Sequence, residues 1–332
     1  MHLNDHDITG SIRTTDPVAV GGEVCRLYRE LFPRTSAAPL ERAFIDTSRI
    51  YYGRHPDYLP CDTEYHDIQH VLDVTLAMAR LMHGYERSRA NGDEPLRREL
   101  FIVGALTALF HDFGYLRKRS DRRHRYGAEY TITHVSRGAA FLRRYLRELG
   151  LGEKCARLAS TLVHFTGYER PADSIRLAGP LERRIGQMLG TADIIAQMSD
   201  RCYLKKCRDR LYPEFVLGAR GAPRGAKPLP AFESGQDLVN KTPGFYQGAA
   251  KRLDVQLGRS YEYAARHFGG SNLYLEGMQR NVQYAANAAR ILRRQPPNTL
   301  LPEVEPYPPD LVSTSAPAGN KPAGRSSAPA RP

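Results

Sequence analysis

The sequence has no long apolar run. No stretch approaches the roughly 20 consecutive apolar residues that a membrane-spanning helix needs. Its first residues, MHLNDHDITGSIRTTDP, are polar and include acids, whereas a secretory signal requires an apolar segment. We therefore expect a cytoplasmic protein that does not bind a membrane.

Cysteines are few and unpaired in the sequence. The chain has five cysteines among 332 residues, and no two of them form a C-x-x-C motif. An odd number without such pairs predicts neither a disulfide framework nor a zinc ribbon. We expect reduced thiols.

Sustained alternation of apolar and polar residues, the pattern of a strand, is also missing. Helical spacing is present instead: in residues 65–82, Ile68, Val71, Leu72 and Ala79 share one face. The predicted fold class is therefore all-α. We expect helices at 65–82, 98–110, 128–148, 154–164, 181–199, 201–211, 245–267 and 274–293.

Composition divides the chain into three parts. Residues 1–20 are expected to form a flexible arm, and the Pro-, Ala- and Ser-rich residues 295–332 a disordered tail. Residues 21–294 are expected to form one helical catalytic domain, which the glycines and prolines of residues 218–235 interrupt with a loop.

The formal net charge of +12 favours an anionic partner, such as a phosphate ester or a nucleic acid. No aromatic-interleaved basic motif or zinc finger indicates nucleic acid. The densest basic run, residues 117–125, has two interpretations. It is either a solvated loop or a phosphate-binding segment in which Arg117, Lys118 and Arg119 contact substrate.

Histidines and aspartates stand at apolar positions of several predicted helices. His66 and His70 are four residues apart, which predicts one shared helix face. His111 and Asp112 end the apolar helix at 98–110, where Gly114 is expected to adopt a left-handed conformation. The pair is either a hydrogen-bonded cap or part of a metal site, because a buried carboxylate needs a cation.

Three further side chains interrupt apolar surroundings. Asp193 is a single carboxylate inside the helix predicted at 181–199, and buried Asp is rare without a cationic partner. His134 and His164 stand in largely apolar helical segments. Taken singly, each of these two histidines is better explained as a core residue, or as an outer neighbour of a metal site, than as a metal ligand.

The order of a histidine, a His-Asp pair and a distant aspartate resembles the HD-domain superfamily of metal-dependent phosphohydrolases. This resemblance covers roughly residues 60–200. It implies an all-α, HD/PDEase-like helical bundle in which His70, His111, Asp112 and Asp193 bind a divalent metal. Binuclear members of the superfamily use two more histidines, and His134 and His164 follow in the corresponding order.

The tract YHDIQHVLDV at residues 65–74 is similar to the signature Y-H-N-x-x-H-A-x-D-V of class I cyclic-nucleotide phosphodiesterases, with Asp67 in place of Asn. The similarity implies that His66 is a general acid and His70 a metal ligand. Two positions depart from that family. Tyr115 stands where the family motif H-D-x-x-H has its second histidine, and only Gln247 is a candidate for the family's substrate-binding glutamine.

The expected function is hydrolysis of a phosphate ester by metal-activated water, with a phosphodiester or nucleotide as substrate. Ligation by oxygen and imidazole suits one or two ions of Mn, Mg, Fe or Zn. The alternatives are a cyclic-nucleotide phosphodiesterase proper, a non-catalytic metal-binding regulator and a nucleic-acid-binding protein.

Overall fold

The computed structural model describes residues 5–222, 225 and 229–292, and this part of the chain is all-α, as predicted. Across the described ranges there is no β-strand, only isolated bridges between His6 and Arg13 and between Tyr58 and Lys118. The expected tail, residues 295–332, lies outside the described residues. The helices are α1 (Pro17–Leu31), α2 (Ala38–Tyr51), α3 (Ile68–Ser88), α4 (Arg98–Leu109), α5 (His134–Glu148), α6 (Gly152–Leu162), α7 (Pro180–Ser199), α8 (Tyr203–Lys206), α9 (Tyr212–Gly221), α10 (Gly235–Lys251), α11 (Glu262–Phe268) and α12 (Leu273–Leu292).

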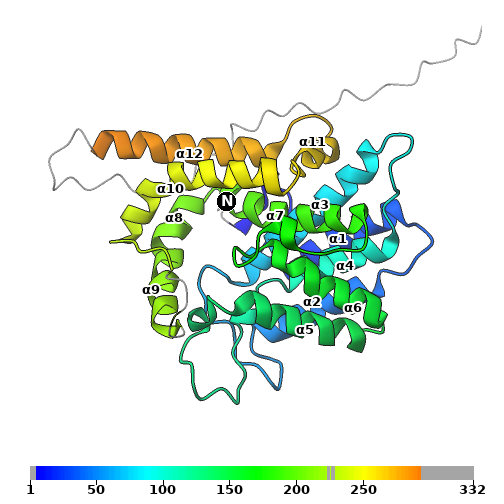
Figure 1. Ribbon diagram of the computed structural model, residues 1–332, viewed down its shortest axis with the longest axis horizontal. Helices are drawn as coiled ribbons and strands as arrows, with labels where there is room; N and C mark the ends of the chain where they lie inside the picture. Colours follow the sequence, from blue (N-terminus) through cyan, green and yellow to red (C-terminus); the bar gives the residue numbers. More distant parts are fainter. Residues whose placement is uncertain (1–4, 223–224, 226–228, 293–332) are drawn as a thin grey trace, which may run out of the picture.

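Helices α3, α4 and α7 form the centre of the bundle. α3 packs against α1, α4, α7 and α11, and α4 is buried on all sides from Leu100 to Leu109. Figure 1 shows α10 and α12 along one edge of the molecule and α2, α5 and α6 towards the opposite edge. No helix of the described residues is long and apolar enough to cross a bilayer.

Two helices, α1 and α2, occupy residues 17–51, where the sequence analysis predicts none. Their start signals are nevertheless ordinary. Asp16 accepts a hydrogen bond from the backbone N–H of Val18, and Pro17 opens the helix, as N-cap and first-turn residues do. The segments predicted at 201–211 and 245–267 are interrupted by π-helical turns at Cys207–Leu211 and Arg252–Gln256.

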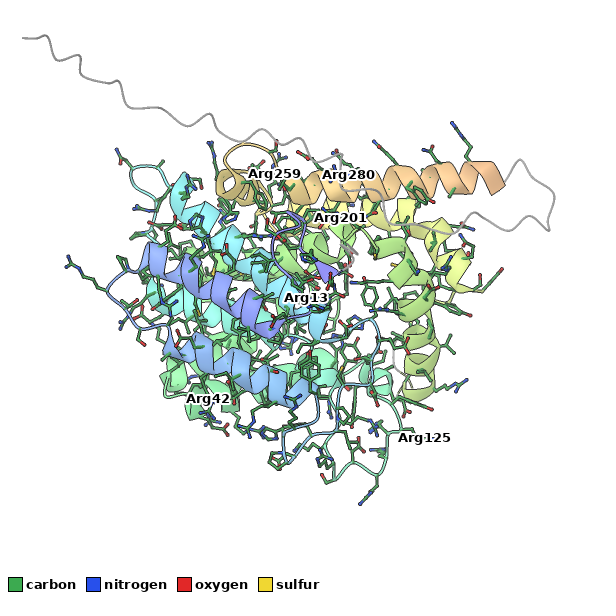
Figure 2. All side chains as sticks on the ribbon, turned by 180° about the vertical axis from the view of Figure 1, so that it is seen from behind. Arg13, Arg42, Arg125, Arg201, Arg259 and Arg280 are labelled. Atoms are coloured by element: carbon green, nitrogen blue, oxygen red, sulfur yellow. The ribbon has the colours of Figure 1, made fainter. Side chains whose placement is uncertain are left out.

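The basic side chains are spread over several elements. Figure 2 shows Arg13, Arg42, Arg125 and Arg259 on separate parts of the surface. Arg13, Arg42 and Arg259 each form an ion pair with a nearby carboxylate. At these three arginines, a neighbouring carboxylate therefore offsets the positive charge.

Residues 5–16 fold back onto α3, although residues 1–20 were expected to form a flexible arm. The Asp7 carboxylate accepts hydrogen bonds from the backbone N–H groups of Ser11 and Ile12. It also pairs with Arg80 of α3 at 2.5 Å, and both side chains are buried. This buried ion pair joins positions 73 residues apart, so the local composition of the arm gave no sign of it.

Replacing Asp7 by Ala is expected to lower the free energy of unfolding by about 3–5 kcal/mol, because it leaves the Arg80 guanidinium buried without its counter-charge. Urea unfolding measures this difference. The matched control is Asp5→Ala, which breaks an ion pair with Arg13 whose side chain is 62% exposed; exposed pairs contribute little. Equal losses in the two variants would contradict the role of the Asp7–Arg80 pair.

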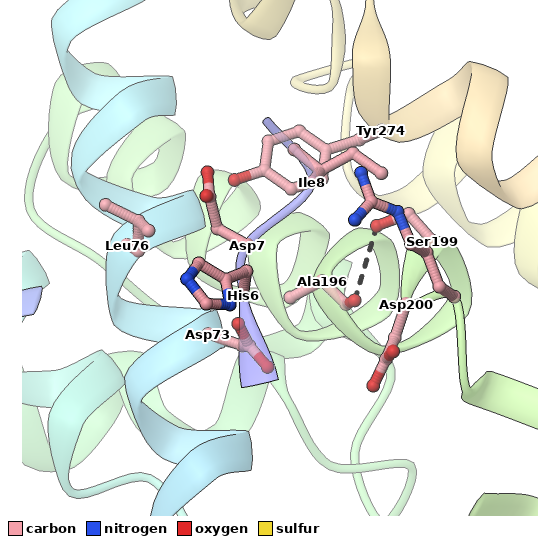
Figure 3. Close-up of a pocket in the computed structure, with 10 residues that line it drawn as sticks. His6, Asp7, Ile8, Asp73, Leu76, Ala196, Ser199, Asp200 and Tyr274 are labelled. Carbon is pink, nitrogen blue, oxygen red and sulfur yellow. Dashed lines mark hydrogen bonds between the residues drawn. The ribbon is translucent and has the colours of Figure 1, made fainter. Parts of the chain in front are cut away.

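The N-terminal segment also closes a small cavity. Figure 3 shows that Asp7 and Ile8 line this cavity together with Asp73 of α3 and with Ser199 and Asp200 at the end of α7. The cavity measures about 20 Å³, which is room for about one water molecule. Burial raises the pKa of Asp73 to about 8. A space of this size does not accommodate a substrate.

Candidate metal centre

Four side chains converge between α3, α4 and α7. His70 lies in the first turn of α3, His111 and Asp112 follow α4, and Asp193 lies inside α7. His70 Nε2 is 3.2 Å from Asp112 Oδ2 and 3.5 Å from Asp193 Oδ1. His111 Nε2 is 3.1 Å and 3.7 Å from the same two oxygens. Both imidazoles therefore face one oxygen of each carboxylate.

Backbone contacts set the orientation of the two histidines. Asp67 caps α3, and its Oδ1 accepts a hydrogen bond from the backbone N–H of His70 at 3.0 Å. Asp and Asn are both favoured N-cap residues, so Asp67 performs the local task of the Asn in the similar signature. His111 Nδ1 lies 2.8 Å from the Ala108 carbonyl; donation to that oxygen leaves Nε2 free to coordinate.

Gly114 is needed for a close approach rather than for a left-handed conformation. Its φ is not positive, so the expected left-handed helix end is wrong. A Cβ at this position would instead collide with the carbonyl of His134. The glycine therefore allows the turn Phe113–Tyr115 to pack against the start of α5, which brings His134 close to Asp112.

The buried atoms of the cluster fit a divalent cation. Among the described residues, His111 Nε2 and Asp112 Oδ2 have no hydrogen-bond partner, although they lie 3.1 Å apart. They are thus two ligand atoms facing a common space, not a donor and its acceptor. One ligand atom each from His70, His111 and Asp193 also lies within 4.8 Å of the others. Unpaired buried polar atoms are costly, and a metal ion would satisfy them together.

The protonation states agree with this fit. Burial raises the pKa of Asp112, but His111 and His66 outweigh it, so the pKa lies well below its ordinary value. Burial lowers the pKa of His70, but Asp112 and Asp193 outweigh it and raise the pKa to about 10. The carboxylates of Asp112 and Asp193 are therefore ionised and need a cation beside them. A metal ion can be that cation while both imidazoles stay neutral and able to coordinate.

His134 and His164 differ in their relation to Asp112. His134 Nε2 lies 3.6 Å from Asp112 Oδ1, and its Nδ1 lies 2.7 Å from the Thr131 carbonyl. Burial lowers the pKa of His134, which favours the neutral, ligating form. His164 Nδ1 lies 2.7 Å from Glu169 Oε1, a contact that leaves its Nε2 free to coordinate. The structure therefore brings His134 to Asp112, and the role of His164 at a second metal stays a prediction.

His66 lies outside the helix, and the prediction that it shares a face of α3 with His70 is wrong. α3 begins at Ile68 because Asp67 is its cap. His66 Nδ1 is instead 2.6 Å from Glu214 Oε2, and its ring centroid is 5.5 Å from that of His70. The ring of His66 nevertheless lies beside the cluster.

Glu214 and Tyr115 hold His66, a role that the sequence predicted for neither residue. Glu214 in the first turn of α9 accepts hydrogen bonds from the backbone N–H groups of Tyr65 and His66 as well. Tyr115 stacks on His66 at 4.6 Å and on His134 at 4.4 Å between ring centroids. Tyr115 stood out in the sequence because it replaces a histidine of the family motif. Glu214 did not stand out, because acidic residues are common at the start of helices.

The candidate substrate-binding residues are Arg117, Lys118, Arg119 and Gln247, and the structure shows the contacts of two of them. Arg117 pairs with Asp62, and Arg119 donates to the carbonyl of Gly53, so both connect the basic loop to residues 53–62. Lys118 is exposed within the same loop, and Gln247 is exposed on α10. Substrate binding by these four residues stays a prediction.

Solved structures that resemble this fold include two phosphodiesterase domains. The phosphodiesterase domain of the rhodopsin phosphodiesterase from Salpingoeca rosetta has a TM-score of 0.53 and 13% sequence identity, over 89% of this chain and 94% of that one. The phosphodiesterase domain of the RhoPDE fusion protein from the same choanoflagellate has the same TM-score and identity, over 89% of this chain and 98% of that one. No protein-family model and no curated protein matches the chain. The chain therefore has the all-α fold of phosphodiesterase domains.

Proposed function

We propose that this protein is a metal-dependent hydrolase of phosphate esters, with a phosphodiester or nucleotide as substrate. The observation that carries the proposal is the convergence of His70, His111, Asp112 and Asp193, in which buried ligand atoms of His111 and Asp112 have no hydrogen-bond partner among the residues that the structure describes. The similarity in fold to phosphodiesterase domains supports the same class of reaction.

The four converging side chains would hold the metal, and Mn, Mg, Fe and Zn all suit their oxygen and imidazole atoms. When bound, a divalent ion supplies Lewis acidity at the phosphoryl oxygens and lowers the pKa of water. Asp112 contributes one oxygen towards His70 and His111 and the other towards His134. The carboxylate is thus oriented to serve two ions.

His66 is the proposed general acid for the leaving oxygen. Burial lowers its pKa, but the carboxylates of Glu214 and Asp112 outweigh burial and raise the pKa above its ordinary value. The imidazole therefore stays cationic to a higher pH than a free histidine. The Glu214 contact fixes Nδ1, which leaves Nε2 to donate the proton.

Replacing Glu214 by Gln is expected to lower the pKa of His66, because it removes the largest charge that favours the cationic imidazole. The alkaline limb of kcat for a dinucleotide substrate should then move to lower pH, because His66 loses its proton sooner. A pH–rate profile measures the shift. For bis(p-nitrophenyl) phosphate, whose leaving group needs no proton, this limb should not move. A limb that moves equally for both substrates would contradict the role of Glu214.

A second metal ion is proposed at Asp112 and His134. His134→Ala should reduce the metal content from two ions per chain to one and lower turnover, because Asp112 Oδ1 loses its imidazole partner at 3.6 Å. Elemental analysis after gel filtration measures the stoichiometry. His55→Ala, at a half-buried histidine of another segment, is the control. An unchanged content in His134→Ala would remove His134 from the site.

A substrate panel separates the remaining alternatives. Cyclic nucleotides, mononucleotides and dinucleotides are incubated with the protein in the presence of Mn or Mg. Turnover of phosphodiesters in general supports the proposed hydrolase, and turnover confined to cyclic nucleotides makes the protein a cyclic-nucleotide phosphodiesterase proper. Bound metal without any turnover makes it a metal-binding regulator and overturns the proposal.

A further inference from the structure

A cavity of about 290 Å³ lies between the turn after Phe165 and the end of α10. It is lined by Tyr168, Gly248, Lys251, Arg252, Val255 and Gln256. None of the lining residues is acidic, and none belongs to the proposed metal ligands. The volume is near the lower end of ligand pockets, which span roughly 300–1,000 Å³. The cavity therefore has the size for a small molecule.

Arg252 gives this cavity a buried positive charge. The residue is only 7% exposed, and its Nη2 donates to the carbonyls of Phe165 and Gly167 at 2.7 and 2.8 Å. Its Nε and Nη1 have no hydrogen-bond partner within the part of the chain that the structure describes. A buried cation with unpaired donors is costly, and an anion is the partner that the guanidinium lacks.

Two apolar side chains flank this charge. The ring of Tyr168 lies 3.9 Å from the Arg252 guanidinium, yet Tyr168 is 79% exposed and Val255 is 72% exposed. Lys251, also exposed, adds a second cation to the lining. Tyr168 and Val255 line the same cavity, and apolar groups that are exposed side by side mark ligand-binding grooves. The cavity thus combines an anion-binding base with an apolar rim.

We propose that this cavity binds an organic phosphate of mononucleotide size, with its phosphate on Arg252 and Lys251 and its ring against Tyr168. Arg donors match phosphate oxygens as a fork, and planar rings stack on Tyr. Nε and Nη1 of Arg252 are covered by the chain, and the exposed Tyr168 ring lies over the guanidinium, so the phosphate would have to displace this ring to reach the two donors. The occupant would also contact the turn that carries His164, since Arg252 holds the carbonyls of Phe165 and Gly167.

The test uses a fluorescent reporter at the cavity. The chain contains no tryptophan, so Tyr168→Trp introduces a single indole and keeps a ring over Arg252. The full chain, stripped of metal with a chelator, is titrated with adenosine 5′-monophosphate, adenosine and inorganic phosphate. Because the protein is metal-free and no turnover is measured, failure here is distinct from failure of the proposed hydrolase.

The expected result is a saturable change in emission with adenosine 5′-monophosphate below roughly 10 mM, the range of a Kd near 1 mM. Adenosine and inorganic phosphate should each bind about tenfold more weakly. Lys251→Glu in the reporter background should weaken the nucleotide by about tenfold or more. Lys154→Glu, at an exposed lysine on α6, should leave its binding unchanged. A response without saturation, equal binding of adenosine, equal binding of inorganic phosphate, or indifference to Lys251→Glu would overturn the proposal.

Discussion

Replacing His111 by Ala is expected to remove the bound metal and abolish turnover of every phosphodiester substrate. His111 Nε2 is buried, has no other partner in the described chain, and faces both Asp112 and Asp193. Loss of an outer partner of a metal ligand alone lowers affinity by roughly 10–100-fold, so loss of the ligand itself should exceed 100-fold. Elemental analysis and a turnover assay measure the two effects.

Asp193→Asn provides a variant of nearly the same shape. It should reproduce the loss of metal, because an amide oxygen lacks the charge that holds a divalent ion, and it should leave the helical circular dichroism unchanged. His55→Ala controls for the general effect of removing a histidine. If His111→Ala keeps its metal while folded, the convergence of these side chains does not form the metal site.

His66→Ala is expected to leave the metal content nearly intact and to slow hydrolysis selectively. As a general acid, His66 should contribute roughly 10²–10⁴-fold to the rate. The loss should appear with dinucleotides, whose leaving alkoxide needs a proton. It should be small with bis(p-nitrophenyl) phosphate, whose leaving group is stable as an anion. Steady-state kinetics on both substrates measure this difference.

The matched control for His66→Ala is Glu214→Gln, which keeps the imidazole and changes only its partner. This variant should retain more activity towards dinucleotides than His66→Ala does, with its pH profile shifted as described above. Equal losses on both substrates in His66→Ala, together with lost metal, would make His66 a ligand and overturn its assignment as the acid.

The sequence predicted the cluster because its members carry local signals. His111 and Asp112 end an apolar helix, and Asp193 interrupts another, so each was anomalous where it stood. Their order along the chain resembles that of the HD-domain superfamily, and this resemblance implied a common site. The structure places the ligand atoms of His70, His111 and Asp193 within 4.8 Å of one another. The all-α fold followed equally directly from the spacing of apolar residues.

Two of the contacts that the sequence did not predict are long-range. Glu214 reaches His66 across 148 residues, and Asp7 reaches Arg80 across 73 residues. The residues that neighbour Glu214 and Asp7 in the sequence do not distinguish these two acids from acids that face solvent. The start of α3 was predicted wrongly for a different reason. His66 and His70 have the spacing of one helix face, so the helix was expected to include both. The helix begins after His66 because Asp67 caps it by accepting a hydrogen bond from the backbone N–H of His70.

The most direct test of the metal-dependent hydrolase is removal and return of the metal in the 332-residue chain. The chain is stripped with a chelator, and Mn is added back in steps while bound metal and turnover of bis(p-nitrophenyl) phosphate are measured together. The account predicts that turnover disappears on stripping and returns in proportion to the bound metal, and that His111→Ala recovers neither. Turnover that survives complete removal of the metal, or full metal occupancy without turnover, would contradict it.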